Sequence, residues 1–308
     1  MDQRLRRDLD AIARDRSSGA SELAQRACLA LQQWLGRRPD ISRDELVAAA
    51  RALLIAQPAM APLLRLANEL ALAAGESHPS QYLKPGLARF SSTMQRGPSR
   101  IARHFRDALG KGDPKIICTY SYSSTVLHFI LAARSRIWQV ICSEGRPGLE
   151  GRKTVEQILR RGISASLTTD AALHMFTTYC HALVLGADSL ELAGFTNKVG
   201  TGALVAYALQ IGRPVWVLAD TSKLLPPEID ALRNDNSDNN ARYGPNSEIW
   251  ADPPKRLAIL NPYFEKTRYR PGIRILTENG WRTPAQISRD ISKVTISPLL
   301  ETLSEAPH

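Results

Sequence analysis

The sequence contains few cysteines and no cluster of metal-binding residues. Its four cysteines, Cys28, Cys118, Cys142 and Cys180, lie far apart among 308 residues and form no Cys-x-x-Cys pair. The six histidines show no spacing typical of a zinc site. We therefore expect buried, reduced thiols rather than disulfide bonds. We predict neither a bound metal nor a cofactor.

Long apolar runs are also absent. No segment approaches the roughly 18–20 consecutive apolar residues that a membrane span requires. The first residues, Met1–Arg7, are rich in charge and no apolar stretch follows them, so the sequence predicts no signal peptide. We expect a cytoplasmic protein without a membrane partner.

The charge of the chain is biased toward the basic side. The sequence has 40 Lys and Arg residues against 30 Asp and Glu residues, a formal charge of +10, which suggests nucleic acid or phosphorylated ligands as partners. The basic residues are nevertheless interleaved with acidic ones, and no aromatic-basic pattern of an RNA-binding module appears. A nucleic-acid binder rests on charge alone and stays the weakest of three hypotheses; a mildly basic, solvated surface is the interpretation that we prefer.

The first third of the chain has the apolar periodicity of helices. Helical spacing of apolar residues is found over four stretches, 23–34, 46–56, 63–74 and 99–109. Ser42, followed three residues later by Glu45, forms a capping box ahead of the second stretch, and Pro58 ends it. The segment 110–114, rich in Gly and Pro, interrupts the helical pattern.

After Pro114 the pattern changes to short apolar runs separated by helical stretches. Runs typical of buried strands cover residues 116–118, 138–142, 163–167, 182–185, 215–219, 257–260 and 273–276. Helical patterns cover residues 125–133, 152–160, 171–178 and 198–211, and a polar loop is expected over 234–246. This alternation predicts an α/β fold: a helical domain over residues 1–113, followed over 114–308 by a doubly wound, mainly parallel sheet.

Polar residues follow several of the predicted strands. They stand at 119–121, 143–146, 170, 187–188 and 197–198. Any one of these groups is also compatible with a turn or a helix cap. Because ligands of an open parallel sheet bind beyond the carboxyl ends of its strands, the groups together predict a polar cleft.

Two cations and one carboxylate give this cleft its expected chemistry. Arg146 and Lys198 suit a phosphate group, and amides at a helix start add to that attraction. Asp188 follows an apolar strand, where burial would raise its pKa and suit it to proton transfer. The alternative is that Asp188 caps a helix or pairs with Lys198.

Several motifs of this sequence resemble those of a known family. They are Gly186-Ala187-Asp188, Asn197-Lys198-Val199-Gly200-Thr201, Glu144-Gly145-Arg146-Pro147 with Glu150-Gly151, Asn261-Pro262-Tyr263-Phe264-Glu265, Thr277-Glu278-Asn279-Gly280 and Ser18-Gly19-Ala20. In this order, they resemble the signature of the translation initiation factor 2B alpha, beta and delta subunits, a family that includes methylthioribose-1-phosphate and ribose-1,5-bisphosphate isomerases. The resemblance implies that the sheet is Rossmann-like and that the α/β domains pair into a homodimer.

The resemblance assigns the catalytic positions and shows where this chain departs from the isomerases. These enzymes use an Asp and a Cys to move protons while an aldose phosphate becomes a ketose phosphate; the Asp matches Asp188, and Ser121 stands where the Cys would be. Tyr120 replaces a His of the same motif. A serine hydroxyl has a far higher pKa than a thiol, whose reference value is about 8.5, and exchanges no proton near neutrality without a base.

The same resemblance implies a ligand-binding set. The isomerases hold phosphate with Arg-Gly-Ala, whereas this chain has Ser18 before Gly19 and Ala20, with Arg16 two residues upstream. Gly19 and Ala20 would offer backbone amides, and Arg16 would supply charge. The set is completed by Arg146, Glu150, Asn197 and Lys198.

Two functions lead at the level of sequence. The first is an initiation-factor-2B-like regulatory or ligand-binding protein with a pocket for a phosphorylated sugar or nucleotide. The alternative is an aldose–ketose sugar-phosphate isomerase, an intramolecular oxidoreductase, with an altered active site at Asp188 and Ser121. Ser121, which stands in place of the catalytic Cys, is the residue that distinguishes these two functions.

Overall fold

The N-terminal part of the chain is a bundle of helices. The computed structural model describes residues 1–15, 18–38, 40–110, 112–235 and 243–304. The bundle consists of α1 (Gln3–Arg14), α2 (Ala20–Arg37), α3 (Arg43–Ala56), α4 (Ala61–Ala74) and α5 (Pro79–Ala108). Ser42 and Glu45 form the predicted capping box of α3. Within the described residues, no helix is both long and apolar enough to cross a membrane.

Helix α5 is much longer than the predicted stretch 99–109. It covers 30 residues and continues through Pro85 and Pro98, although an internal proline removes a backbone hydrogen bond. Its buried side chains recur at helical spacing along the whole length, Leu83 and Phe90 against the bundle and Phe105 against the sheet. Burial of this apolar face therefore outweighs the local effect of the two prolines.

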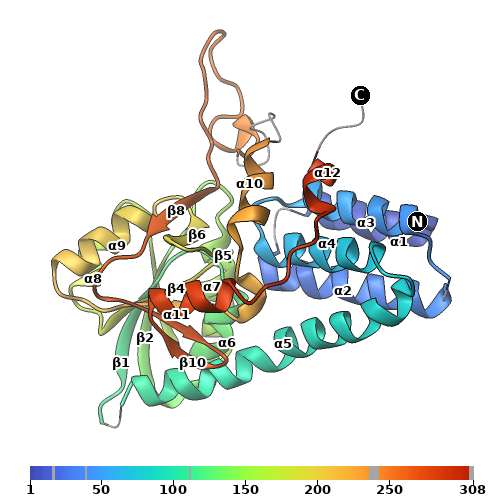
Figure 1. Cartoon of the computed structure of the whole chain (residues 1–308). Helices are drawn as coiled ribbons and strands as arrows, with labels where there is room; N and C mark the ends of the chain where they lie inside the picture. Colours follow the sequence, from blue (N-terminus) through green and yellow to red (C-terminus); the bar gives the residue numbers. More distant parts are fainter. Residues whose placement is uncertain (16–17, 39, 111, 236–242, 305–308) are drawn as a thin grey trace.

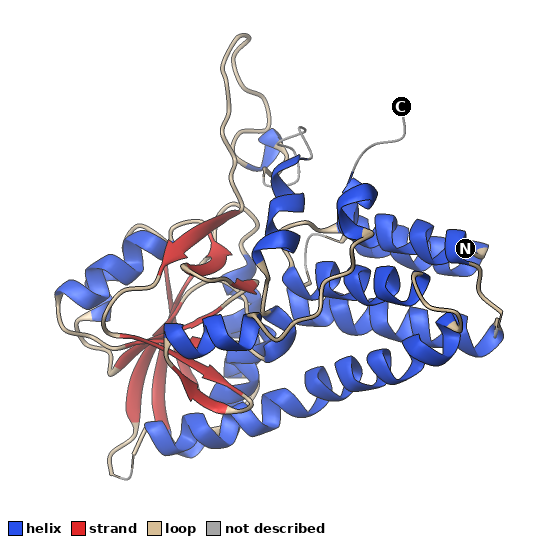
Figure 2. Ribbon diagram, in the orientation of Figure 1, coloured by secondary structure: helices blue, strands red, loops and turns tan. Residues whose placement is uncertain are grey.

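The C-terminal part contains a seven-stranded sheet, as the alternating pattern predicts. Its order is β10-β9-β7-β4-β1-β2-β3, and only β10 runs antiparallel to its neighbour. The strands are β1 (Lys115–Thr119), β2 (Ile137–Ser143), β3 (Ser164–Thr168), β4 (Ala182–Gly186), β7 (Val215–Leu218), β9 (Ile273–Thr277) and β10 (Gly280–Arg282). Figure 2 shows the sheet in red with helices around it. Two separate apolar clusters pack against the sheet, so the prediction of a helix-covered α/β sheet is confirmed.

Helices follow most of the strands. They are α6 (Ser124–Ala132), α7 (Glu150–Leu159), α8 (Leu173–Thr177), α9 (Thr201–Gln210), α10 (Pro227–Asp235), α11 (Pro284–Ile291) and α12 (Leu300–Ser304), with short 3-10 turns η1 (Arg134–Arg136), η2 (Thr221–Lys223) and η4 (Asn246–Glu248). Leu225 before α10, Ile229 in α10 and Leu300 in α12 pack into the core of the N-terminal bundle. The division of the chain into two domains at residue 113 stays a prediction.

A second, three-stranded sheet was not predicted. It has the order β5-β6-β8, with antiparallel pairing of β5 (Ser189–Leu190), β6 (Gly194–Lys198) and β8 (Phe264–Arg268). The prediction that a helix begins at Lys198 was therefore wrong. Lys198 ends β6, Gly200 turns the chain with a φ of 96°, and α9 begins at Thr201. A glycine accepts this left-handed conformation without a side-chain clash.

The predicted strand over residues 257–260 was also wrong. These residues form no strand, and Leu257 and Leu260 are exposed by 49% and 76%. Figure 1 shows the orange segment between η4 and β8 projecting from the body of the molecule. An apolar run there has no neighbouring strand with which to pair. The predicted loop over 234–246 starts within the end of α10, and its residues 236–242 lie outside the described residues.

We predict that the contact between α5 and the sheet is a main source of stability. The ring of Phe105 is fully buried, 5.6 Å from Trp216 and 6.1 Å from Phe129 between centroids. Phe105→Ala should lower the free energy of unfolding by about 3–5 kcal/mol, measured by urea denaturation. The exposed Ser99→Ala on the same helix should change it by less than about 0.5 kcal/mol. Equal effects of the two variants would contradict this account.

Candidate functional site

A small polar cavity lies where the helical bundle meets the carboxyl ends of the strands. Its volume is about 60 Å³. The lining residues are Ser18, Gly19, Met60, Ser121, Tyr122, Glu150, Asp188, Asn197, Lys198, Tyr263 and Phe264. They come from the starts of α2, α4, α7 and β8 and from the ends of β1, β4 and β6. The fold thus brings together six of the predicted site residues, whose roles remain predictions.

Lys198 is the buried cation of this cavity. Its side chain is only 4% exposed, and its Nζ donates to Glu150 Oε1 at 2.8 Å. The ammonium also lies over the ring of Tyr263, 4.2 Å from the centroid. Removing an ammonium group from water is unfavourable unless opposite charge and hydrogen bonds replace the hydration. Glu150 and the Tyr263 ring provide that replacement.

The second carboxylate oxygen of Glu150 is unsatisfied. Glu150 Oε2 is buried and has no hydrogen-bond partner among the described residues. The carboxylate lies against Gly145 and Gly148, where an added Cβ would come within 3.1 Å and 2.8 Å of its oxygens. A buried acceptor of this kind needs a donor. A hydroxyl group of a ligand would provide one.

The start of α2 supplies backbone amides. Gly19 is the N-cap residue, lines the cavity, and gives the helix no side-chain cap. The first amides of a helix lack intrahelical partners and attract anions. Ala20 is the first residue of α2 and is 2% exposed, but it is not among the lining residues. Arg16, predicted to add charge here, lies outside the described residues.

Asp188 and Ser121 face the same cavity from adjacent strand ends. The backbone of Asp188 is held on both sides: its N–H donates to the Thr196 carbonyl at 2.8 Å, and its carbonyl accepts from Ala61 N–H at 3.1 Å. Ser121 is buried with a φ of 63°, a left-handed conformation that non-glycine residues rarely adopt. Strained backbone of this kind clusters at functional sites.

The neighbouring thiols do not replace the cysteine that Ser121 lacks. Cys118 and Cys142 are both fully buried, as expected for core residues. Burial, together with the nearby Asp170 carboxylate, raises the pKa of Cys142 to about 12. The pKa of Cys118 is raised as well, because its thiol donates a hydrogen bond to Cys180 and because it is buried. Neither thiol ionises near neutral pH.

Arg146 does not line the cavity, and it is exposed. Its backbone N–H donates to Asp170 Oδ2 at 2.6 Å, and its guanidinium donates to the Glu248 carbonyl at 3.3 Å. In this structure Arg146 therefore connects loops outside the cavity, and its contact with a ligand stays a prediction.

Tyr263, Phe264, Tyr122 and Met60 line the cavity but were not assigned to it from sequence. Tyr263 and Phe264 belong to the family motif Asn261–Glu265. This motif was the signal in the sequence that could have identified them as site residues. The strand β8 that begins with Phe264 pairs with β6, so this motif is placed beside Lys198 by a sheet that the sequence did not predict.

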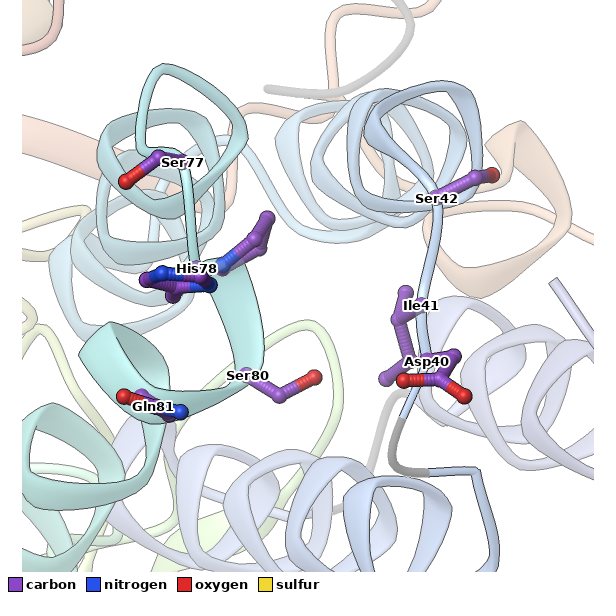
Figure 3. Close-up of a pocket in the computed structure, with 8 residues that line it drawn as sticks. Asp40, Ile41, Ser42, Ser77, His78, Ser80 and Gln81 are labelled. Carbon is purple, nitrogen blue, oxygen red and sulfur yellow. The ribbon is translucent and has the colours of Figure 1, made fainter.

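Two other features of the molecule lie outside the lining of this cavity. Glu278, from another of the motifs, is buried; its carboxylate accepts from the Thr221 N–H at 3.1 Å, and burial raises its pKa. A wider hollow of about 430 Å³ lies at the starts of α3 and α5 (Figure 3), lined by Asp40, Ser42, His78 and their neighbours. Its described lining includes no Lys or Arg, and none of the predicted site residues lies there.

Comparison with known proteins identifies the family of this chain. The model of the initiation factor 2 subunit family matches residues 12–284. The eIF-2B subunit 2-like translation initiation factor of Pyrococcus horikoshii is 29% identical over 224 residues, covering 71% of this chain and 78% of that protein. The ribose 1,5-bisphosphate isomerase of Haloterrigena turkmenica is 26% identical over 298 residues, covering 90% of each chain.

A solved structure shows the same fold. The crystal structure of the eIF-2B translation initiation factor of Pyrococcus horikoshii OT3 has a TM-score of 0.75 at 24% identity, covering 93% of this chain and 99% of that one. The family model spans nearly the whole chain. This chain belongs to the initiation factor 2 subunit family.

Proposed function

We propose that this chain is a ligand-binding or regulatory protein of the initiation factor 2B type, whose cavity holds a phosphorylated sugar or nucleotide. The observation that carries the proposal is the buried Lys198 ammonium in a cavity that Gly19, at the uncapped start of α2, also lines. Both features favour an anion. The unsatisfied Glu150 Oε2 adds an acceptor for a hydroxyl group. A sugar phosphate carries both an anionic group and hydroxyl groups.

Binding requires the cavity to widen. Its volume of about 60 Å³ is well below the roughly 300–1,000 Å³ of typical ligand pockets. We propose that the Tyr263 side of the cavity wall moves. Tyr263 follows the projecting segment, and its hydroxyl is held by Glu248 of η4 rather than by the rigid parallel sheet. Release of that hydroxyl would open the side of the cavity next to Lys198.

A second function, isomerisation of an aldose phosphate, is favoured by one observation. Asp188 and Ser121 line the same cavity as Lys198, so a carboxylate and a hydroxyl would both face a bound sugar. Some relatives in the family are sugar-phosphate isomerases. We rank this function second because the described site offers no thiol that ionises near neutral pH beside Asp188.

We also propose a homodimer, with strand β3 in the interface. β3 is an edge strand of the large sheet, and its residues Ser164–Thr168 are mostly exposed and include no charged side chain. Natural proteins usually protect such edges with charge or cover them. Leu167 on β3 and Trp138 on the adjacent β2 are exposed by 45% and 61%. A second copy would cover both.

The ligand proposal predicts a phosphate-dependent thermal shift. Pentose phosphates and nucleoside monophosphates should raise the melting temperature by roughly 5–10 °C at 100 times their dissociation constant, whereas ribose and adenosine should not. The shift should vanish in the double variant Lys198→Gln/Glu150→Gln. This variant removes both charges of the ion pair, so no single buried charge is left without its partner. The exposed Lys293→Gln serves as a control and should keep it. Equal shifts with unphosphorylated sugars, or a full shift in the double variant, would refute the proposal.

The ranking of the two functions predicts the outcome of turnover assays. Wild-type protein should not convert ribose 1,5-bisphosphate or 5-methylthioribose 1-phosphate to a ketose. Ser121→Cys should gain measurable turnover, because a thiol ionises far more readily than a hydroxyl. Adding Asp188→Asn should abolish this gain, because the amide accepts no proton. Wild-type turnover that collapses in Ser121→Ala would instead identify an isomerase.

The dimer proposal is tested by light scattering during gel filtration. The wild-type protein should have twice the 34.0 kDa mass of the chain. Leu167→Lys places a charge on the β3 edge and should shift the protein to the monomer. Ile55→Lys, at a side chain of α3 that is 67% exposed, is the matched control and should leave the mass unchanged. A monomeric wild type, or a dimeric Leu167→Lys variant, would contradict the proposed interface.

A further inference from the structure

Helix α5 carries half of the net charge of the protein. Its 30 residues include six Lys or Arg residues and one acid, Asp107, a net charge of +5 out of +10 for the whole chain. Basic and acidic residues are interleaved over the chain as a whole. On α5, basic residues predominate.

Five arginines of α5 form a row on its exposed side. They are Arg89, Arg96, Arg100, Arg103 and Arg106, hereafter the arginine row, and all five are exposed. At 3.6 residues per turn they fall within about 120° of the helix circumference, and at 1.5 Å per residue the row is about 26 Å long. Figure 1 shows α5 along the lower border of the molecule, below α2 and the sheet.

The arginine row has no ion-pair partner in the part of the chain that the structure describes: no salt bridge there involves any of its five members. Glu69 and Asp220 approach α5 at its buried glycines, Gly86 and Gly97, on the side of the helix that faces the core. Asp107, four residues after Arg103, is exposed and lies within the same arc of the helix as the row. The exposed side of α5 therefore keeps an excess of four positive charges, five arginines against one acid.

From this geometry we infer that the arginine row binds the phosphate backbone of a double-stranded nucleic acid. Guanidinium groups bind phosphate oxygens in a bidentate manner. A row of about 26 Å is comparable with one turn of a duplex, about 34 Å, so it meets several phosphates at once. Contacts of this kind recognise the backbone and not the base sequence.

The surroundings of the row favour a duplex over a single strand or a membrane. Proteins that bind single strands stack bases on aromatic side chains, and the one large exposed aromatic residue on α5 is Tyr82, seven residues before the row begins. Membrane-surface helices insert an apolar face into lipid. The apolar face of α5, including Phe90 and Phe105, is already buried in the protein core.

The test uses the whole 308-residue chain and fluorescence anisotropy with labelled RNA and DNA duplexes of about 20 base pairs, two turns of helix. Arg96→Gln/Arg100→Gln/Arg103→Gln removes three charges from the row, and Arg6→Gln/Arg7→Gln/Arg43→Gln removes three exposed charges elsewhere. Glutamine keeps helix propensity close to that of arginine. Circular dichroism and the melting temperature check that both variants fold.

The wild type should bind duplexes with a slope of log affinity on log salt near −4 to −5, as five phosphate contacts predict, and the row variant should have a slope of about −2. Its affinity should fall at least about tenfold, while the control variant keeps both slope and affinity. Absence of duplex binding, equal loss in the control variant, or tighter binding of a single strand of the same length would overturn the inference. Binding to phosphatidylserine vesicles that depends on the row, without duplex binding, would overturn it in favour of a membrane partner.

Discussion

The ion pair between Lys198 and Glu150 determines the arrangement of the site. Lys198 ends a strand of the small antiparallel sheet, and Glu150 begins a helix that packs on the large sheet. Because a buried ammonium without its counter-charge is strongly unfavourable, the two sheets are held in one relative position. The ring of Tyr263, at the start of β8, then covers the ammonium. The cavity is the space that remains around this pair.

The helical bundle is part of the site and not an addition to it. Gly19 brings the uncapped start of α2 to the cavity, and the Asp188 carbonyl accepts the hydrogen bond of the first amide of α4. Gln57 holds the end of α1 and the segment after it, through its amide, with bonds to the Ile12, Ala13 and Asp15 carbonyls at 3.3, 3.2 and 2.9 Å. These contacts explain why family motifs occur in the helical region as well as in the sheet.

Local sequence rules predicted the elements whose signals are local. The alternation of apolar runs and helical stretches gave the large sheet, and the Ser42–Glu45 pair marked the start of α3. The polar residues after strands converged, because parallel strands end at one edge of a sheet. The small sheet was missed because β5 and β6 are only two and five residues long, and because the helical pattern assigned to 198–211 included Lys198, the last residue of β6. Arg146 was expected in the cavity on the basis of charge, but its side chain is exposed and its backbone N–H is bound to Asp170, a contact that the sequence pattern did not predict.

A crystal structure of the protein with a bound pentose phosphate is the decisive measurement, because it shows whether Lys198 and the start of α2 hold the phosphate. A phosphate oxygen should lie at roughly 2.7–3.0 Å from Lys198 Nζ, as expected for a charge-assisted hydrogen bond, near the Gly19 and Ala20 amides. A sugar hydroxyl should donate to Glu150 Oε2. A phosphate bound elsewhere on the protein, with the Lys198–Glu150 pair and the Tyr263 ring unchanged, would show that this cavity is not the ligand site.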